Sequence, residues 1–565
     1  MDRILSVSTR TAEGGVVYKS ARTRPIPQLD LLTTLFESKH SYAKEDTKLH
    51  IDADDPTKAI TKSELRTLVK RLASTLRTAY GLGKDGPGRD AVLCIATGHW
   101  QLPTVFYAIL AAGAIFSSSN PGSTPSELLV QLKQVSATLI FCTEDTLPTA
   151  TAAGKLFNLP PDRVLTLSST APGLTLTPLS TPSTPLAISS NLLSWTRVTD
   201  PSTLDTTTIC VLFSSGTTGP PKACILSHTN MTAQASLVLD ASRETASTTD
   251  YMARTIAHLP AAHIAGVQGY FVNSFYAGGS VYWMKRFDFP KFLEYNKKYA
   301  ATGFFSVPPV YLAIAKSPAV TDHFDSLQYA VTGAAPMGAE LQKEVRKKLG
   351  KGKAQVCQTW GLSETTGSMT AMPRGPWNDE TGSVSMLVSN GEARIVDEEG
   401  RDVQPGQEGE IWVRGPQVTR GYWNDEKANR EAFTDGWFKT GDVGLFRDGL
   451  FYIVDRKKEL IKFKGNQVAP AELEALLISH PLIFDAAVIG VAGEETEVPR
   501  AYIVADPKAI TAEQVAAWVA GRVGNHKKLR GGVFFLPAIP KSPSGKILRK
   551  DLRALAKKQE KESKL

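Results

Sequence analysis

Apolar and polar positions along the first part of the chain predict helices and strands in alternation. In 61–80 the apolar residues recur at helical spacing, and Thr61 with Glu64 forms a capping-box pair, so we expect an amphipathic helix there. A second, more apolar helix is predicted over 104–115. Short apolar runs typical of buried strands lie at 91–96, 139–142, 163–167 and 209–213. This alternation indicates an α/β fold with parallel strands.

Residues 81–86 fit the spacing G-x-G-x-x-G but do not predict a dinucleotide site. A Rossmann loop runs from a strand into a helix, whereas this segment leaves a helix and enters a strand. We interpret it as a helix C-cap followed by a turn. Farther along, 174–208 is dense in Thr, Ser and Pro, and we expect an extended surface connection inside the large domain.

The pattern changes after a charged joint at 454–459. Downstream of this joint, helices are predicted over 471–479 and 512–523. Strands are predicted at 486–491, 501–504 and 533–536. These elements are typical of a compact α+β unit of the size of a small domain. We therefore expect a large N-terminal α/β domain of packed sheets and helices, 1–455, and a small α+β C-terminal domain, 456–562.

The composition fits a large soluble globular protein. With 565 residues, of which 42% are hydrophobic and 21% charged, the chain can form several packed domains and is too apolar to be disordered. The longest apolar stretch, 102–116, is shorter than the ~20 residues of a membrane-spanning helix. Met1-Asp2-Arg3 is followed by no sustained apolar stretch, so we expect neither a membrane span nor a signal peptide.

The five cysteines are scattered and lack C-x-x-C spacing: Cys94, Cys142, Cys210, Cys224 and Cys357. This spacing argues against a disulfide framework and a zinc site, so we expect core thiols in a reducing compartment. The net charge of +8 is concentrated near the C-terminal end. A basic patch can bind nucleic acid, but the chain has no recognition-helix, RRM or zinc-finger pattern. Since a surface that attracts a polyanionic small molecule would look the same, we expect no nucleic-acid partner.

A Gly-, Ser- and Thr-rich loop in the middle of the chain is a candidate phosphate site. Residues 214–219 follow an apolar strand, and their backbone N–H groups and hydroxyls can surround phosphate oxygens, while Lys222 adds a positive charge. This is not a Walker A loop, because Gly216 and Gly219 are three apart and Ala223 follows the lysine. An ordinary Ser/Thr-rich surface loop is the alternative.

A second loop, 540–546, places Lys546 on a hairpin-like turn rich in Ser, Gly and Pro. From such a turn the ammonium group could move into and out of a cleft. A movable lysine suits a reaction in which two anions must first meet. Together the two loops indicate that the protein handles ATP.

With further motifs between them, these loops resemble the adenylate-forming superfamily, and most closely its 4-coumarate:CoA ligase branch. The superfamily comprises acyl-CoA synthetases, 4-coumarate:CoA ligases, firefly luciferases and peptide-synthetase adenylation domains. The motifs occur in the family's order and extend over nearly the whole chain: 214–222, 259–263, 332–336, 358–364, 409–416, 436–442, 455–459 and the segment that ends at Lys546. One such match is weak, whereas the ordered series is specific.

The resemblance implies an ATP site. Its phosphate-binding residues would be Ser214, Ser215, Gly216, Thr217, Thr218, Gly219 and Lys222. The other nucleotide contacts would come from Thr359, Trp360, Ser363, Asp442, Arg456 and Lys546. Trp360, which replaces the family's usual tyrosine, would stack on adenine, and Ser363 would reach the α-phosphate. Asp442 and Arg456 would bind the ribose. Glu364 and Thr218 would hold Mg²⁺ near the phosphates.

The resemblance also assigns the residues that act on the acid. Joining a carboxylate to the α-phosphate brings like charges together, so the site must supply cations, and Lys546 would bridge the two groups during adenylation. The other catalytic candidates are Lys222, His263 and Lys462. The acid would contact His263, Ile264, Ala265, Gly269, Ala334 and Gly361. The family often has an aromatic residue at the position of Ala265, so we expect a roomy acid pocket here.

The segment 462–474 after the joint resembles the same stretch of the coumarate-ligase branch. This implies that the small domain acts as a lid, which rotates about a hinge at Lys458 and withdraws Lys546 after adenylation. The rotated domain would then line a pantetheine tunnel for CoA with Lys462, Lys464 and Gly465. A lysine-rich solvated strand is the alternative, since a basic surface is only a charge argument.

The resemblance implies an acyl- or aryl-CoA ligase. Such an enzyme converts a carboxylic acid and ATP to acyl-adenylate and pyrophosphate, and then uses CoA to form acyl-CoA and AMP. One alternative passes the acyl group to a carrier protein or an amine, and another is a luciferase-like oxygenase. A third is a catalytically silent binding protein, against which the intact Lys546 and Glu364 argue. The sequence does not name the acid.

The residues Ser563-Lys564-Leu565 match the peroxisomal address that an import receptor reads. They follow a Lys/Glu tail that we expect to be flexible and to expose them. A charged tail that ends in leucine by chance is the alternative. We therefore expect the protein in the peroxisome.

Overall fold

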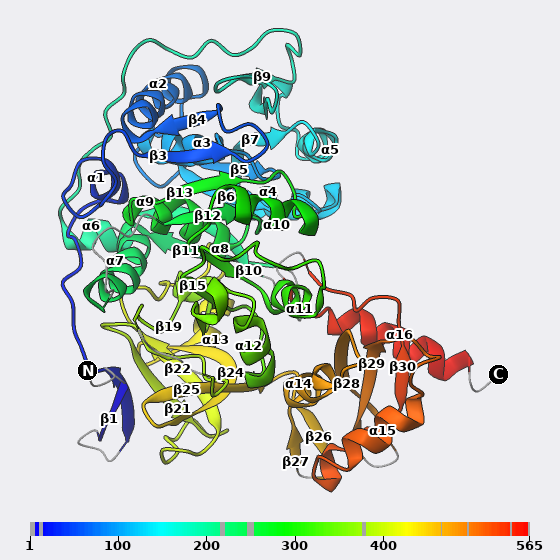
Figure 1. Cartoon of the computed structure of the whole chain (residues 1–565). Helices are drawn as coiled ribbons and strands as arrows, with labels where there is room; N and C mark the ends of the chain where they lie inside the picture. The colour runs from blue at the N-terminus through cyan, green and yellow to red at the C-terminus, as the bar shows by residue number, and fades with distance from the viewer. Residues whose placement is uncertain are drawn as a thin grey trace.

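The computed structural model describes residues 6–10, 15–214, 221–245, 253–375, 380–464, 466–493, 496–542 and 545–562. Figure 1 shows a large body that extends to β25 (Leu450–Arg456) and a smaller body beside it, drawn in orange and red. The large body combines several sheets with covering helices, and the smaller one is α+β. The predicted fold class is therefore confirmed.

The N-terminal part of the large body is built on a mostly parallel sheet. Its strand order is β11 (Lys222–Ser227), β10 (Thr208–Ser214), β6 (Ile115–Ser119), β5 (Ala91–Ile95), β7 (Ala137–Thr143), β8 (Val164–Leu167) and β9 (Leu176–Pro178). The strands from β10 to β8 are parallel, and the edge strands β11 and β9 are antiparallel to their neighbours. The helices that pack against this sheet are α3 (Leu102–Ala111), α4 (Pro125–Val135) and α5 (Leu147–Leu156), and α2 (Lys62–Tyr80) packs on α3.

Helix α2 has the predicted ends. The Thr61 side chain accepts a hydrogen bond from the Glu64 backbone N–H, and the Glu64 carboxylate accepts one from the Thr61 backbone. The helix ends at Gly81, whose φ of 75° lies in the left-handed region, so the C-cap interpretation is confirmed. The end predicted for the next helix is wrong: α3 stops at Ala111, because Gly113 turns the chain with a φ of 81°.

Two smaller sheets complete the α/β part. One has the order β12 (Arg254–Ala257), β13 (Ser280–Trp283), β3 (Lys48–Asp52) and β4 (Ala59–Thr61), and the other β14 (Gly303–Ser306), β15 (Tyr329–Thr332) and β16 (Gln355–Gln358). Further helices are α1 (Leu31–Phe36), α6 (Pro201–Thr206), α7 (His228–Thr245), α8 (Ile264–Gly266), α9 (Ser274–Tyr276), α10 (Phe289–Lys298), α11 (Pro308–Lys316) and α12 (Ala339–Arg346). A π-helical segment, Val267–Asn273, joins α8 to α9.

An antiparallel sheet forms the lower part of the large body in Figure 1. Its strands are β1 (Ser6–Arg10), β2 (Val16–Ser20), β21 (Glu392–Val396), β22 (Gly409–Arg414), β24 (Trp437–Arg447) and β23 (Phe433–Thr434), with β25 on β24. Helix α13 (Glu426–Ala432) precedes β23, and the short hairpins are β17 (Gly361–Leu362) with β18 (Gly367–Ser368) and β19 (Thr370–Ala371) with β20 (Met386–Leu387). The β24–β25 hairpin pairs Asp442 with Arg456, so two predicted ribose contacts lie opposite each other.

The smaller body contains the elements predicted downstream of the joint. A hairpin of β26 (Ile461–Phe463) and β27 (Asn466–Val468) leads to a sheet of β28 (Asp485–Ala492), β29 (Glu497–Val504) and β30 (Val533–Phe535). Helices α14 (Pro470–Ser479), α15 (Ala512–Ala520) and α16 (Arg549–Glu562) pack around it. Its core includes the fully buried Leu473, Val488 and Ile503.

The expectation of a flexible Lys/Glu tail is wrong as far as Glu562. The tail forms α16, which buries Leu552 and Ala556 against the sheet of the smaller body. The apolar residues recur every four positions there, which is a helical period that the abundance of charged residues concealed. The expected extended surface connection is confirmed for most of 174–208, because residues 179–200 form neither helix nor strand and are exposed or half-buried. The rest of this segment contributes β9 to the edge of the first sheet and forms the short helix α6.

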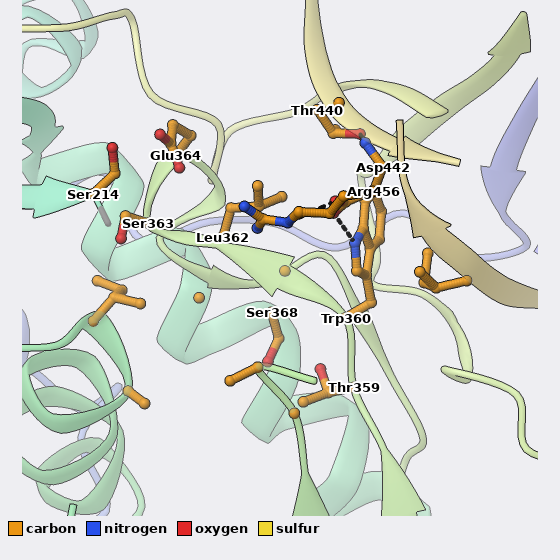
Figure 2. Close-up of a pocket in the computed structure, with 18 of the residues that line it drawn as sticks. Ser214, Thr359, Trp360, Leu362, Ser363, Glu364, Ser368, Thr440, Asp442 and Arg456 are labelled. Atoms are coloured by element: carbon orange, nitrogen blue, oxygen red, sulfur yellow. Dashed lines mark hydrogen bonds and ion pairs between the residues drawn. The ribbon is translucent and has the colours of Figure 1, made fainter. Parts of the chain in front are cut away.

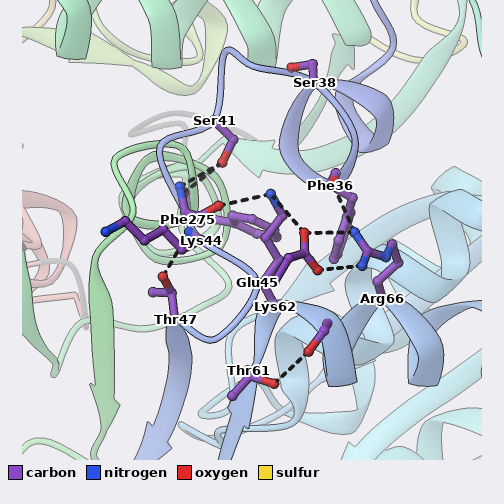
Figure 3. Close-up of polar contacts among 12 residues, drawn as sticks. Phe36, Ser38, Ser41, Lys44, Glu45, Thr47, Thr61, Lys62, Arg66 and Phe275 are labelled. Atoms are coloured by element: carbon purple, nitrogen blue, oxygen red, sulfur yellow. Dashed lines mark hydrogen bonds and ion pairs between the residues drawn. The ribbon is translucent and has the colours of Figure 1, made fainter.

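The N-terminal segment is fastened to α2 by a polar cluster (Figure 3). Arg66 donates to Glu45 at 3.1 Å and to the Phe36 carbonyl at 3.2 Å. Lys62, which is buried, donates to the Ala43 carbonyl at 3.0 Å. Its burial lowers the pKa of Lys62, whereas the hydrogen bond from Arg66 lowers the pKa of Glu45. The cluster attaches residues 36–47 to α2, and none of these residues lines the cavity described below.

All five cysteines are buried, so the prediction of core thiols is confirmed. Burial raises the pKa of Cys94, Cys210 and Cys224. Among the described residues, none of the helices has the length and apolar character needed to cross a membrane.

Candidate active site

A cavity of about 560 Å³ lies between the large body and the loop that carries Lys546. Most residues that the sequence assigned to a site line it: Ser214, Lys222, His263, Ile264, Ala265, Gly269, Ala334, Thr359, Trp360, Gly361, Ser363, Glu364, Asp442, Arg456, Lys458 and Lys546. They come from segments that are hundreds of residues apart in the chain. The fold therefore brings the separate motifs into one concave site.

Some predicted site residues are not in the cavity. Lys462 and Lys464 are exposed on the hairpin of β26 and β27, and neither lines the cavity. Lys464 has a φ of 44° at the tip of that hairpin. The phosphate-loop residues Ser215, Gly216, Thr217, Thr218 and Gly219, together with Gly465, lie outside the described residues.

One end of the cavity holds a hydrogen-bonded group of three side chains. The indole Nε1 of Trp360 donates to Asp442 Oδ2 at 2.7 Å, and Arg456 Nε lies 3.3 Å from Asp442 Oδ1. Trp360 and Asp442 are 6% and 5% exposed, so both oxygens of the carboxylate are held in a fixed direction. Figure 2 shows the indole nitrogen directed toward Asp442 and the Arg456 side chain passing beside the carboxylate toward the middle of the view, with Glu364, Ser363 and Ser214 on the other side.

A second polar group surrounds Glu364. The Tyr422 hydroxyl donates to Glu364 Oε1 at 2.9 Å, and Lys222 Nζ lies 4.8 Å from the centre of the Tyr422 ring. Glu364 is also fixed through its backbone, because its carbonyl accepts from Thr419 N at 2.7 Å. Burial and the carboxylate raise the pKa of Tyr422, so this side chain remains a neutral donor. The group places a carboxylate and an ammonium beside the start of the predicted phosphate loop.

One carboxylate in this position fits a magnesium ion that arrives with a nucleotide. Within the described residues, no group of three or more His, Cys, Asp or Glu side chains could hold a metal ion alone. Mg²⁺ is usually bound by one or two carboxylates and by substrate phosphates, and it keeps several waters. Glu364 has one oxygen occupied by Tyr422 and lines the cavity, so it suits an ion that shares its other ligands with phosphates.

Lys546 reaches the cavity from the smaller body. Its loop is a hairpin closed by a bridge between Lys541 and Ile547 and by the hydrogen bond from Ser542 N to the Lys546 carbonyl at 2.8 Å. Removal from bulk water and the charge of Arg456 lower the pKa of Lys546 to about 8, although Glu364 and Asp442 act in the opposite direction. The ammonium therefore lies within electrostatic range of both polar groups.

His263 lies near Lys546 in the cavity wall. Its Nδ1 accepts from the Ala265 backbone N–H at 3.2 Å, so the neutral ring carries its proton at Nε2. Burial and the Lys546 charge lower the pKa of His263 to about 3. The imidazole is therefore a neutral donor at physiological pH.

The wall beyond His263 is formed by small residues and amides. A Cβ added at Gly269 would have no atom within 4 Å, so this position opens onto free space. Ala265 is half-buried, and Ala334 turns the chain with a φ of 69°. The small side chains agree with a roomy pocket.

The two bodies are held together near the cavity. Lys316, at the end of α11, donates to the carbonyls of Ile483 and of Ile478, the latter at 3.5 Å, and lies 5.7 Å from the Phe484 ring centre. Asp455, at the end of β25, accepts from Ala471 N at 2.9 Å. Burial raises the pKa of Asp455 to about 6. These contacts place the Lys546 loop over the cavity.

Several lining residues were missed in the sequence. Tyr422 follows a recognised motif at 409–416 and could have been found as the only tyrosine near it. Gln234, Gln268 and Asn273 carry no local signal, because buried amides inside apolar helices have no distinctive spacing. Only the fold reveals that they face one space.

Comparison with known proteins gives consistent matches over the chain. The family model described as AMP-binding enzyme matches residues 38–423, and the model described as AMP-binding enzyme C-terminal domain matches residues 472–546. A protein of Emericella nidulans with the provisional name acyl-coenzyme A synthetase is 45% identical over 548 residues, which cover 96% of this chain and 98% of that protein. The phenylacetyl-CoA ligase epaB of Aspergillus niger is 36% identical over 540 residues, with 93% and 96% coverage.

The solved structures show the same architecture. ATP-bound MatB from Rhodopseudomonas palustris has a TM-score of 0.79 and 26% identity, and the match covers 93% of this chain and 98% of MatB. An anthranilate CoA ligase solved with anthranoyl-AMP has a TM-score of 0.76 at 21% identity. At that identity the second match shows the fold alone.

Proposed function

The chain belongs to the family of AMP-binding enzymes, and we propose that it is an AMP-forming acid–thiol ligase. In the first step the carboxylate of an acid attacks the α-phosphate of ATP, which gives acyl-adenylate and releases pyrophosphate. In the second step the thiol of CoA attacks the acyl carbon, which gives the acyl-CoA thioester and releases AMP. The full-length likeness to acyl-CoA synthetases and CoA ligases supports this reaction.

The position of Lys546 is the observation that carries the proposal. It reaches the cavity from a loop near the end of the smaller body, far along the chain from the joint, and its charge interacts there with Glu364, Asp442 and Arg456. If the smaller body moves, the Lys546 ammonium moves with it. This charge can then stabilise the transition state of the first step and leave the cavity before the second step. The roles of Trp360, Asp442 and Arg456 at adenine and ribose are part of the same proposal.

We also propose that the smaller body rotates about Lys458 for the second step. Lys458 lines the cavity at the joint between the bodies, whereas Lys462 and Lys464 are exposed on the neighbouring hairpin. Rotation would move Lys546 out of the cavity and bring this hairpin to it, where the hairpin would contact CoA. We further propose that Mg²⁺ binds together with ATP at Glu364. We also propose that residues 563–565 direct import of the protein into the peroxisome.

Pyrophosphate release with and without CoA tests the reaction. Acid-dependent release, followed by CoA-dependent release of AMP, is expected. A carrier protein or an amine as the true acceptor would leave AMP release independent of CoA. Light emission or oxygen uptake would indicate a luciferase-like oxygenase.

Lys546→Ala should slow adenylation by about 10²–10³, the usual effect of removing one donor that acts in the transition state. Thioester formation from supplied acyl-adenylate should decrease much less, because Lys546 leaves the site before that step. Single-turnover measurements of each half-reaction distinguish the two effects. Equal losses in both steps would contradict the proposed exchange of conformations.

A further inference from the structure

Tyr422 contacts two charged side chains of the cavity. Its hydroxyl donates to Glu364 Oε1 at 2.9 Å, and Lys222 Nζ lies over its ring, 4.8 Å from the ring centre. Tyr422 and Glu364 are each 6% exposed, and all three residues line the cavity. One tyrosine therefore touches both the carboxylate and the ammonium beside the predicted phosphate loop.

The backbone of Tyr422 is fixed by two contacts that do not involve its side chain. It forms a β-bridge with Cys224 of β11, the strand that begins at Lys222. The Asn429 side chain accepts from Tyr422 N at 2.7 Å and donates to the Tyr422 carbonyl at 3.1 Å. The position of the ring therefore does not depend on the hydrogen bond to Glu364.

Glu364 and Lys222 carry opposite charges but do not pair with each other. Within the part of the chain that the structure describes, Lys222 forms no ion pair, and Glu364 Oε2 has no hydrogen-bond partner. This oxygen is not fully enclosed, and Glu364 lines the cavity. Because the ring attracts the ammonium to its face and the hydroxyl occupies one carboxylate oxygen, the two charges are held apart.

A hydrogen bond to one oxygen of a carboxylate is typical of a side chain that binds a metal ion through its other oxygen. Such outer hydrogen bonds orient the ligand, and their loss usually weakens metal binding about 10- to 100-fold. Mg²⁺ is bound by one or two carboxylates together with substrate phosphates. The Tyr422 hydroxyl has the position of the outer donor, since it occupies Glu364 Oε1 and leaves Oε2.

We propose that Tyr422 is a positioning residue that fixes the orientation of Glu364 for the magnesium ion that arrives with ATP. This inference rests on the proposed function, since it concerns the magnesium–ATP complex that the same cavity would bind. Tyr422 acts through Glu364 and takes no part in the bond changes of either step. Its hydroxyl increases the contribution of Mg²⁺ to the affinity for ATP.

A purely structural role of Tyr422 predicts a different result. Tyr422→Phe keeps the ring, which still fills the buried space and still attracts the Lys222 ammonium. Only the hydrogen bond to Glu364 is lost in this variant. A change confined to the magnesium-dependent part of nucleotide binding therefore reports on the carboxylate and not on packing.

Equilibrium binding tests the inference without turnover. ATP is titrated into the full-length protein without an acid, once with Mg²⁺ and once with EDTA, and AMP is titrated in the same way. In Tyr422→Phe we expect the Kd of the magnesium–ATP complex to rise about 10- to 100-fold. The Kd of ATP in EDTA and the Kd of AMP should stay near their wild-type values, because neither depends on the ion.

A double-mutant cycle identifies the residue through which Tyr422 acts. Glu364→Gln removes the charge of the carboxylate, so the addition of Tyr422→Phe to this variant should cause no further loss of magnesium–ATP affinity. Tyr276→Phe is the matched control. Tyr276 is 1% exposed, donates to Asp240 Oδ2 at 3.2 Å and does not line the cavity. Its dissociation constants should equal those of the wild type.

The possible results separate the inference from the proposed function. If Mg²⁺ does not strengthen the binding of ATP to the wild type, the proposed magnesium site at Glu364 fails, and the inference fails with it. If Mg²⁺ strengthens binding to the wild type and to Tyr422→Phe by the same factor, only the inference is overturned. Equal weakening of magnesium–ATP, metal-free ATP and AMP by Tyr422→Phe also overturns it, because the hydroxyl would then support the cavity as a whole.

Discussion

At the residue scale, Lys546 and His263 are neighbours whose pKa values are both lowered by removal from water. The charge of Lys546 lowers the pKa of His263 further, and the charge of Arg456 does the same to Lys546. His263 is therefore neutral throughout the useful pH range, while the pKa of Lys546 falls to about 8. The catalytic charge of the proposed enzyme is thus the group that titrates near physiological pH.

This titration predicts an alkaline limit of activity. Lys546 is protonated below about pH 8 and loses its charge as the pH rises, so kcat/KM for ATP should fall above that value with the slope of one ionisation. Lys546→Arg should be slower but should lose this limit, because a guanidinium stays protonated. Initial rates of pyrophosphate release from about pH 6 to about pH 10 give the profiles.

Lys550→Arg is the control for this experiment, since Lys550 is exposed on α16 and does not line the cavity. It should keep the wild-type profile. A wild-type profile that stays level to about pH 10 would mean that Lys546 does not titrate in the active conformation.

Trp360 should position Asp442 in addition to any contact of its ring with the base. Trp360→Phe keeps an aromatic ring but removes the 2.7 Å hydrogen bond to the buried carboxylate. A hydrogen bond to a charged group contributes about 1.5–3 kcal/mol, so the KM for ATP should rise at least tenfold. The rise should be much smaller for 2′,3′-dideoxy-ATP, which lacks the hydroxyls that Asp442 is proposed to bind.

The comparison of the two nucleotides separates positioning from packing. Loss of packing alone would weaken both nucleotides by the same factor. An equal loss for ATP and for the dideoxy analogue would therefore show that the Trp360–Asp442 hydrogen bond does not serve ribose recognition.

The sequence predicted the charged part of the cavity far better than its amide wall. The charged residues stand in motifs whose residue types follow from phosphate chemistry. All of them line one cavity: Lys222, Glu364, Asp442 and Lys546. Gln268 could not be identified in the same way. Its place in the wall depends on the fold, since its amide is held by the Met231 carbonyl on another helix.

At the scale of elements, the end of α11 is fastened to the end of α14. The Lys316 ammonium contacts the carbonyl of Ile478 in the last turn of α14, where helix carbonyls lack partners within the helix, and the carbonyl of Ile483 just after the helix. Burial lowers the pKa of Lys316, so the contact is shielded from water. It holds the smaller body in the arrangement that places Lys546 over the cavity.

Lys316→Met should therefore slow adenylation and spare thioester formation. Loss of charged hydrogen bonds of this kind costs about 1–2 kcal/mol. This cost corresponds to a decrease of roughly 5- to 30-fold in the rate of adenylation. The two half-reactions are measured separately by single-turnover kinetics. Lys297→Met is the matched control, because Lys297 pairs with Asp322 inside the large body at 2.7 Å. Equal rates for Lys316→Met and the control would exclude this contact as a determinant of docking.

Helices and strands with a strong local sequence pattern were predictable. Elements whose conformation depends on tertiary contacts were not. The capping box of α2 and the buried strand β5 could be read from spacing alone. The π-helical segment Val267–Asn273 could not, because a shift to i→i−5 hydrogen bonds depends on packing and on the Ser274 hydroxyl, which donates to the Gly269 carbonyl at 2.9 Å. Helix α16 was missed because its charge was taken as a sign of flexibility.

At the scale of the whole molecule, the cavity is completed by a residue close to the C-terminal end. Asp442 and Glu364 come from the large body, and Lys546 comes from the smaller one. Under the proposed function, adenylation would therefore depend on how the two bodies are arranged, and this dependence would let the second step exclude the first. The order of motifs along the chain predicted both bodies, but their contacts through Lys316 required the fold.

Removal of residues 563–565 should move a fluorescent fusion from puncta to the cytosol and leave activity in vitro unchanged. The tripeptide matches a receptor-read address, and α16 before it buries Leu552 and Ala556 several residues earlier, so the core does not depend on the last residues. Lys564→Glu should have the same effect at full length. Lys558→Glu, on an exposed position of α16, changes the charge equally and should leave the puncta intact. Puncta that persist without the tripeptide would refute the address, and cytosolic signal from Lys558→Glu would show that the charge of the tail acts instead.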